Sequence, residues 1–379
     1  MAETSSDAFL SGEGIPVELH DVETELVRLW GPSAERAGGP ELENPHVTRM
    51  VLANLVVAGH STSAAELEPV LFEVTALYPC RSIIIRKTDR PERKINAEVS
   101  ALCQIPAPGS PQICSERILL LSGPRAADLL PGAVRPLLEA NLPFVLWWAE
   151  DPRADEALFR DLGDECSRMI LDLPDPGTDL AALRLGLDPK INAHTRDAAW
   201  FSLTNWRELV AQFFDPPGHL ENLALIDSVR IDALSPGPLP RTAAWLAAWL
   251  AGQLNWTPLG SPERSTNELK AQFQGPNGPI KVEIATQNSG SALTQAQIRG
   301  ITLTTASAQG VERFRLERPT PDSSQIHAKI NSTSYCTLPR VVNAPEPSRA
   351  KRVAAALQAS RVDPTFDHAL PHLFWLLEG

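Results

Sequence analysis

The sequence is poor in cysteine and has no excess of basic residues, and each shortage excludes a class of protein. Five cysteines in 379 residues, with no CxxC pair, are too few and too scattered for a disulfide framework and fit a reducing compartment. The net charge is −12, so the chain lacks the clustered lysine and arginine that neutralise nucleic-acid phosphates. We therefore expect no nucleic-acid partner.

Long hydrophobic runs are also missing. No stretch reaches the roughly 18 apolar residues that a transmembrane helix needs. The first residues carry no positive segment followed by an apolar one, which a secretory signal would require. We expect a cytoplasmic protein that does not insert into a membrane.

Signatures of phosphate binding and catalysis are absent as well. There is no GxxxxGK followed by Ser or Thr, no GxGxxG after a strand, no HExxH and no GxSxG. His368 and His372 are four residues apart, but Pro371 separates them and no glutamate stands where a metalloprotease base belongs. The sequence therefore predicts no catalytic residue, no metal site and no cofactor.

Length and charge distribution suggest an arm followed by two domains. Residues 1–45 hold ten acids and two arginines, about two thirds of the net negative charge. We interpret them as an acidic arm that is either disordered or partly helical, with a helical stretch within Val17–Trp30. A chain this long with 43% hydrophobic residues exceeds one ordinary core, so we predict domains at 46–190 and 191–379.

Strands and helices alternate through the first domain, which predicts an α/β fold with a mixed sheet. The strands of Glu98–Ile105 and Ile113–Ser122 flank the turn-rich segment 106–111 and should pair antiparallel. The other predicted strands are Asn54–Ala58, Arg81–Arg86, Pro143–Trp148 and Met169–Leu173, and the predicted helices are Ser63–Tyr78, Arg125–Ala140 and Asp155–Leu162.

Tryptophan recurs at helical spacing in the centre of the chain. A stripe of apolar residues predicts one long amphipathic helix; it comprises Ala199, Leu203, Trp206, Val210 and Phe213. An apolar run, Leu223–Ile231, precedes a second helix that carries Trp245 and Trp249 one turn apart, and Trp256 follows its end. Packing in a core is favoured over docking for these aromatic side chains.

After Ser261 the segments become short and rich in threonine, serine and glutamine, which is typical of antiparallel strands. They are Ile280–Ala285, Ile298–Thr305, Val311–Leu316 and Gln325–Ile330. Ser348 and the pair Asp363-Pro364 are start signals for two closing helices, to Ser360 and to Leu377. The fold class is thus α/β, mixed with α+β: an α/β domain, Trp-rich central helices, and a domain with an antiparallel sheet and closing helices.

A basic segment and two cysteines stand out as candidate functional groups. Six cations lie within residues 81–94, which indicates either a solvated loop or a positive patch that meets an acidic partner or the acidic arm. Cys103 and Cys114 lie on the two strands expected to pair, so they are redox candidates. Trp147 and Trp148 end a strand that runs into the acidic segment Ala149–Arg153, where α/β sheets often place ligand crevices.

Five segments in this order resemble the OpcA family, the glucose-6-phosphate dehydrogenase assembly proteins of cyanobacteria and actinobacteria. They are Asn54-Leu-Val-Val with Arg81-Ser-Ile-Ile, Pro106-Ala-Pro-Gly-Ser-Pro-Gln-Ile-Cys-Ser-Glu116, Pro143-Phe-Val-Leu-Trp-Trp148, Trp200-Phe-Ser-Leu-Thr-Asn-Trp-Arg207 and Trp245-Leu-Ala-Ala-Trp-Leu250. The resemblance covers most of residues 45–379. The acidic segment 149–153 departs from the glycine- and proline-rich loop expected there.

The resemblance implies a non-catalytic, cytoplasmic partner that binds glucose-6-phosphate dehydrogenase, favours its active oligomer and tunes its redox response. The residues predicted to contact that partner are Arg81, Trp147, Trp148, Trp206 and Arg207. The alternative is a sugar-phosphate or nucleotide-binding sensor or enzyme that uses the basic loop 86–94, with Asp151 as an acid.

Overall fold

The computed structural model describes residues 14–30, 47–59, 61–104, 112–175, 179–216, 219–289, 295–307, 310–332, 338 and 340–378. The chain forms two compact units, each assembled from separate stretches of sequence. The first comprises residues 1–173, 185–197 and 349–361, and the second comprises 174–184, 198–348 and 362–379. Helices and strands are mixed in both, which confirms the expected α/β class. The turn-rich segment 106–111 lies outside the described residues.

Within the described residues, the first unit is built on a nine-stranded sheet, which is mixed, as the sequence predicts. Its strands follow the order β1-β5-β6-β4-β3-β7-β8-β9, with β2 also paired to β6. Parallel pairing runs from β6 through β4, β3, β7 and β8 to β9, whereas β1, β5 and β6 pair antiparallel. The bounds are β1 Ile15–Val17, β2 Val47–Arg49, β3 Asn54–Gly59, β4 Arg81–Lys87, β5 Ile95–Gln104, β6 Gln112–Ser122, β7 Phe144–Trp148, β8 Arg168–Leu171 and β9 Thr195–Asp197.

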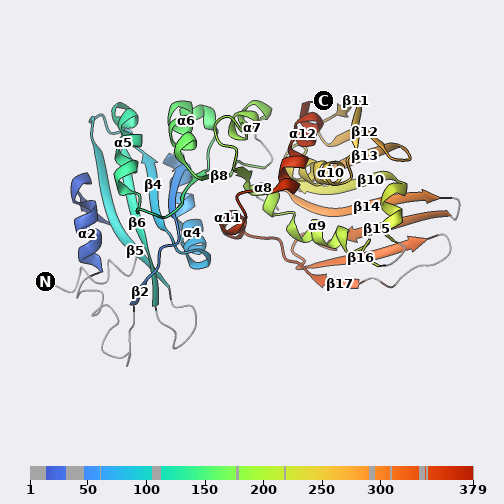
Figure 1. Cartoon of the computed structure of the whole chain (residues 1–379), viewed down its shortest axis with the longest axis horizontal. Coiled ribbons are helices and arrows are strands. Elements are labelled where there is room, and N and C mark those ends of the chain that lie inside the picture. The colour runs from blue at the N-terminus through green and yellow to red at the C-terminus, as the bar shows by residue number, and fades with distance from the viewer. Residues whose placement is uncertain are drawn as a thin grey trace. The chain divides into compact units, whose positions relative to one another are not determined.

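Helices cover this sheet because its central strands are apolar on both faces. Every side chain of β3 and β7 is buried, as expected of parallel strands between helical layers. Helix α4 (Ser61–Leu77) packs against β3, β4 and β5, and α11 (Arg349–Gln358) packs against α4 and β8 (Figure 1). The remaining helices are α2 Val22–Leu29, α5 Leu130–Val134 and α6 Glu156–Glu165, with 3₁₀ turns η1 Leu19–Asp21, η2 Pro124–Leu129, η3 Arg135–Leu137 and η4 Pro152–Asp155. Helix α7 (Leu180–Gly186) lies where the chain passes from one unit to the other.

Two helices that the sequence predicts as continuous are broken in the structure. The expected helix Arg125–Ala140 consists of η2, α5 and η3, because Pro131, Gly132 and Pro136 interrupt it. The expected long helix carrying Trp206 is divided into α8 (Ala198–Phe201) and α9 (Thr204–Ala211). At the break, Ser202 Oγ donates to Ala199 O at 2.6 Å, a local bond that competes with the helical ladder.

The second unit is built on an eight-stranded sheet, in the order β11-β12-β13-β10-β14-β15-β16-β17. The sheet is antiparallel, as expected, except at one pair: β10 and β13 run parallel. Helix α10 carries the chain back after β10, so that β11 and β13 start from the same end as β10. The bounds are β10 Ile226–Ser235, β11 Thr257–Arg264, β12 Glu268–Gly275, β13 Gly278–Asn288, β14 Gln297–Ser307, β15 Gly310–Glu317, β16 Gln325–Ser332 and β17 Arg340–Asn343.

The core of the second unit lies between this sheet and two helices, α10 (Arg241–Gln253) and α12 (Pro364–Glu378) (Figure 1). The 3₁₀ turn η5 (Leu220–Leu225) leads into β10. Trp245 is fully buried, and its ring lies 5.2 Å from that of Trp200 and 4.8 Å from that of Phe366. A Cβ at Gly252 would lie 2.7 Å from His368 O, so only glycine allows α10 to approach α12 this closely. Among the described residues, no helix combines the length and apolar character needed to cross a bilayer.

Candidate functional site

Arg81, the first residue of β4, belongs to a network of charges centred on its buried pair with Glu116 of the adjacent strand β6. Its Nε donates to Glu116 at 2.6 Å, and its terminal nitrogens pair with Glu23 at 2.7 Å and Glu139 at 2.8 Å. Arg49 donates to the same Glu116 at 2.6 Å. Trp30 Nε1 also donates to Glu116, at 2.9 Å. We call these six residues the charge hub.

The electrostatics of the charge hub favour the ionised forms of its members. Burial opposes the charge of Glu116, but the hydrogen bond from Arg49 and the charge of Arg81 outweigh it, so the pKa of Glu116 is lowered. Burial likewise opposes the charge of Arg81, yet Glu116 and Glu23 hold its pKa above the ordinary value. The side chains of Arg81 and Glu116 are 4% and 1% exposed, so the pair acts inside the fold.

The rest of the basic segment 81–94 is largely engaged in ion pairs within the chain. Arg86 pairs with Glu68, and Lys87 lies 3.2 Å from Asp155 and 3.5 Å from Glu150. Other pairs join Arg93 to Asp128 and Lys94 to Glu18. Because Glu18 and Glu23 precede residue 45, the arm does supply acids to this segment, one of the two partners that the sequence suggested.

Asp151 is a poor candidate for the general acid of the enzyme alternative. A hydrogen bond from Arg153, with its backbone N–H and charge, lowers the pKa of Asp151 although partial burial opposes this. A carboxylate with a lowered pKa does not hold a proton at neutral pH.

The predicted contact residues Trp147, Trp148 and Trp206 lie in the cores of the two units. Trp147 and Trp148 are fully buried on β7, where Trp147 Nε1 donates to Asp172 at 3.0 Å. Asp172 also accepts from Arg349 at 2.7 Å. Trp206, on α9, is 1% exposed. Direct contact of these side chains with a partner stays a prediction; their burial shows that they support the fold.

Arg207 differs from these because its guanidinium is half-buried and poorly paired. Its guanidinium stacks 3.8 Å from the centre of the Trp200 ring, and its Nη2 donates to Thr204 Oγ1 at 3.4 Å. Burial lowers the pKa of Arg207 to about 10, against the opposing charges of Asp363 and Glu208. Its Nε donates to no group in the described part of the chain.

The two redox candidates are joined. Cys103 and Cys114 face each other across the β5–β6 ladder, with Cα atoms 4.1 Å apart, and form a disulfide. By contrast, Cys80 and Cys166 are buried thiols, and burial raises the pKa of each to about 12. Among the cysteines that the structure describes, the paired Cys103 and Cys114 therefore remain the candidates for a redox role.

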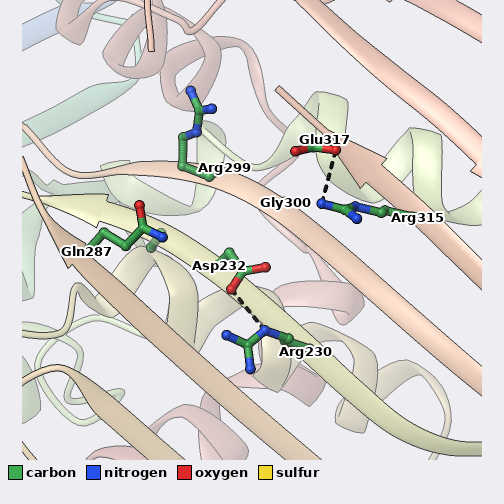
Figure 2. Close-up of a pocket in the computed structure, with 8 residues that line it drawn as sticks. Arg230, Asp232, Gln287, Arg299, Gly300, Arg315 and Glu317 are labelled. Carbon is green, nitrogen blue, oxygen red and sulfur yellow. Dashed lines mark hydrogen bonds and ion pairs between the residues drawn. The ribbon is translucent and has the colours of Figure 1, made fainter. Parts of the chain in front are cut away.

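Sequence reasoning missed the polar face of the second sheet. A pocket of about 240 Å³ lies there, lined by Arg230, Asp232, Ala233, Gln287, Arg299, Gly300, Arg315 and Glu317. Figure 2 shows two ion pairs in it, Arg230 with Asp232 and Arg315 with Glu317, both at 3.0 Å. The sequence did contain a signal for this face: acids and cations recur two residues apart in several strands, and residues two apart lie on the same face of a strand. No group of metal-binding side chains occurs within the described ranges.

Comparison with known proteins gives two matching family models. Residues 73–185 match the glucose-6-phosphate dehydrogenase subunit N-terminal domain, and residues 193–370 match the C-terminal domain of the same subunit. The OpcA protein of Synechococcus elongatus, described as a putative OxPP cycle protein, is 31% identical over 185 residues. That of Synechocystis sp., with the same description, is 32% identical over 220 residues.

These matches leave part of each chain uncovered. The match to the Synechococcus protein covers 48% of this chain and 41% of that protein. The match to the Synechocystis protein covers 56% of this chain and 45% of that protein. The chain thus spans less than half the length of these curated relatives.

Among solved structures, the 3-ketoreductase KijD10 of Actinomadura kijaniata aligns with 88% of this chain and 96% of its own. The TM-score is 0.47 and the identity 13%, too low to carry an argument. The family models, in contrast, match most of the chain in the order of the family's two domains. The chain belongs to the OpcA family of glucose-6-phosphate dehydrogenase subunits.

Proposed function

We propose that this protein is a non-catalytic assembly factor and allosteric activator of glucose-6-phosphate dehydrogenase in the oxidative pentose phosphate pathway. The observation that carries the proposal is the presence of both family domains in one chain, at residues 73–185 and 193–370. The proposal places the protein in the cytoplasm together with the dehydrogenase.

The state of the basic loop supports a binding role over the enzyme alternative. A phosphate site needs cations with donors free to face the ligand. Arg86, Lys87, Arg93 and Lys94 are instead paired with carboxylates of this chain. Together with the lowered pKa of Asp151, this disfavours a sugar-phosphate enzyme built on residues 86–94.

Activation follows from differential binding. A partner shifts an equilibrium only if it binds the active form of the dehydrogenase more tightly than the inactive form. Moving that equilibrium from 1:9 to 9:1 requires about an 80-fold preference. Coupling between two binding sites is reciprocal. A substrate or cofactor whose affinity for the dehydrogenase this protein raises should therefore raise the affinity of this protein by the same factor.

The direct test is a titration with the dehydrogenase of the same organism. Activity and oligomer mass are measured at rising concentrations of this protein, under oxidising and reducing conditions. We expect saturable activation together with a mass shift; an acidic protein of similar charge serves as control. No change in either quantity in both conditions would contradict the proposal, and a thermal shift with glucose 6-phosphate or NADP would then support the ligand-binding alternative.

Among the predicted contact residues, Arg207 is only partly buried, and one of its terminal nitrogens donates to exposed Thr204. We expect Arg207→Met to weaken binding of the dehydrogenase about 10-fold, because a charge-assisted hydrogen bond contributes about 1.5 kcal/mol. Arg160→Met is the matched control, since Arg160 is exposed and paired with Glu156 in its own helix. Equal affinities of the two variants would remove Arg207 from the interface.

The redox part of the proposal rests on the disulfide Cys103–Cys114. Oxidised and reduced protein should differ in affinity for the dehydrogenase, and Cys103→Ser and Cys114→Ser should each abolish the difference. Cys166→Ser, at a buried free thiol, should preserve it. If the affinities are the same in both redox states, control does not reside in this pair.

A further inference from the structure

One face of the eight-stranded sheet in the second unit is open to solvent, and we call it the open face. Along β12 and β10, buried residues alternate with residues that point away from α10 and α12. The charged side chains on the outer side are well exposed: Lys270 53%, Arg230 48% and Arg315 50%. A solvated face is ordinary for such a sheet, so any function must follow from how its charges are arranged.

The strand register places these charges in two adjacent rows across six strands. The acidic row contains, in spatial order, Glu268, Ala285, Asp232, Gly300, Glu317 and His327. The basic row contains Lys270, Glu283, Arg230, Thr302, Arg315 and Lys329. The acidic row thus holds three acids and no arginine or lysine, whereas the basic row holds four cations and one acid.

The two rows arise from three pairs of opposite charges, each two residues apart in one strand. They are Glu268 with Lys270, Arg230 with Asp232, and Arg315 with Glu317. Strand β12 runs antiparallel to β13 and therefore to β10. In β12 the acid comes before the cation in sequence, whereas in the other two pairs the cation comes first. The two differences cancel, so all three acids lie in the same row. Figure 2 shows two of these pairs, Arg230 with Asp232 and Arg315 with Glu317, all four residues of which line the same pocket.

We propose that the open face is the docking surface for a second copy of this chain, related by a two-fold axis that crosses the strands between the two rows. Such an axis exchanges the rows and keeps each strand opposite its own copy. Each acid then faces a cation: Asp232 meets Arg230, Glu317 meets Arg315, and Glu268 meets Lys270 of the second copy. An interface of this kind must be self-complementary, and the rows satisfy that condition.

Small residues remove the conflicts that this arrangement would otherwise create. Glu283, the one acid of the basic row, is placed opposite Ala285. Thr302 is placed opposite Gly300, which is one of the residues that line the 240 Å³ pocket. Arg299 is the extra residue of a β-bulge beside Gly300, and its Nη1 is buried without a hydrogen-bond partner among the described residues. A β-bulge changes the direction in which a side chain points. Here the bulge places the guanidinium of Arg299 among the groups that line the pocket.

The face is large enough for a stable dimer. Six strands spaced about 4.8 Å apart, with the two rows and one further row of outward residues on each side of them, about 6.8 Å from row to row, cover about 780 Å² before side-chain relief is counted. Strands β11 and β17 extend this toward the ~800 Å² per partner of a standard interface. Stacked sheets are rotated by about 30° relative to each other, so the rows of the two copies face each other best at the central strands β10, β14 and β15. Two of the three charge pairs lie on these strands.

The test uses the full chain alone, without the dehydrogenase, so its result is independent of the proposed function. Sedimentation or light scattering should give a mass near twice 41.2 kDa that falls toward 41.2 kDa on dilution and at high salt. Two variants carry like charges on both rows: Arg230→Glu with Arg315→Glu, and Asp232→Arg with Glu317→Arg. We expect each to weaken self-association at least about 100-fold, because like charges then face each other.

A mixture of the two variants separates interface effects from misfolding. At positions 230, 232, 315 and 317 one variant carries only acids and the other only cations, so the mixture should regain a dimer that contains one copy of each. Three results would each overturn the proposal: a wild-type chain that stays at 41.2 kDa up to high micromolar concentration, variants that remain dimeric alone, or folded variants that do not associate when mixed. Protection of the open face by the dehydrogenase in a chain that is otherwise monomeric would assign the face to that enzyme instead.

Discussion

The two sheets of this protein use charge in opposite ways. In the first unit, helices cover the central strands, and charged groups such as Glu116 and Arg81 are buried and tied together. In the second unit, helices cover one face, and the charges stand exposed on the other. A buried charge is strongly destabilising when its partner is removed, whereas an exposed one contributes little to folding. The first arrangement therefore supports the fold, and the second leaves its charges available for recognition.

The aromatic core of the second unit should show the largest effect on stability. Trp245 packs between Trp200 and Phe366 and is fully buried. Trp245→Ala should lower the free energy of unfolding by about 4 kcal/mol, through lost burial and the cavity it leaves. Urea denaturation measures this, with Leu220→Ala as control because Leu220 is 67% exposed. Equal losses in the two variants would contradict the core that we describe.

The charge hub should show the next largest effect. Glu116→Gln leaves Arg49 and Arg81 without their shared carboxylate, and we expect a loss of about 3 kcal/mol. The matched control is Glu317→Gln, which removes an exposed carboxylate from a pair on the open face. A loss below about 1 kcal/mol for Glu116→Gln is what an exposed ion pair would give. It would show that water solvates the remaining arginines, which would contradict the burial described above.

The hub also predicts a dependence of stability on pH. The pKa of Glu116 is lower in the folded protein than in the unfolded chain, where it is about 4.3. Its contribution is therefore complete above about pH 4.3 and is lost as the pH falls through the folded-state pKa. Between pH 5 and pH 3, wild type should lose more stability than Glu116→Gln. Parallel pH curves for the two proteins would argue against the lowered pKa.

Reduction of the disulfide should have a smaller effect. Cys103 and Cys114 are separated by 11 residues, and closing so short a loop contributes at most about 2.8 kcal/mol in the chain-entropy account. The β5–β6 ladder already holds the hairpin, so we expect Cys114→Ser to lose no more than this. Thermal unfolding of wild type with and without reductant is the measurement. A reductant effect that persists in Cys114→Ser would assign it to other thiols.

The open face should show the smallest effect on folding. Arg230→Gln removes one member of an exposed pair with Asp232, and the expected change in unfolding free energy is below about 0.5 kcal/mol. The same variant should weaken self-association, which sharpens the comparison between the two sheets. A large loss of folding stability would instead show that the open face is part of the structural framework.

Much of the fold could be predicted from local pattern. The buried strands Asn54–Gly59 and Phe144–Trp148 read as continuous apolar runs, and α12 begins at its expected Asp363-Pro364 signal. The breaks at Ser202 and within Pro124–Leu137 were missed because an apolar stripe does not reveal local hydrogen bonds or the combined effect of two prolines and a glycine. The parallel pairing of β10 with β13 was missed because it depends on a crossover, which local pattern does not specify.

The sequence by itself determined the class of the fold, the family and the residues that pack in its cores, because these follow from composition, hydrophobic period and ordered motifs. Only the tertiary structure decided which charges are buried and which face solvent. Arg81 and Arg230 are both arginines on strands, yet one is 4% and the other 48% exposed. Their environments are set by strand order and by which face a helix covers. Those features depend on contacts between residues far apart in the chain, and so the charge hub and the open face emerge only on folding.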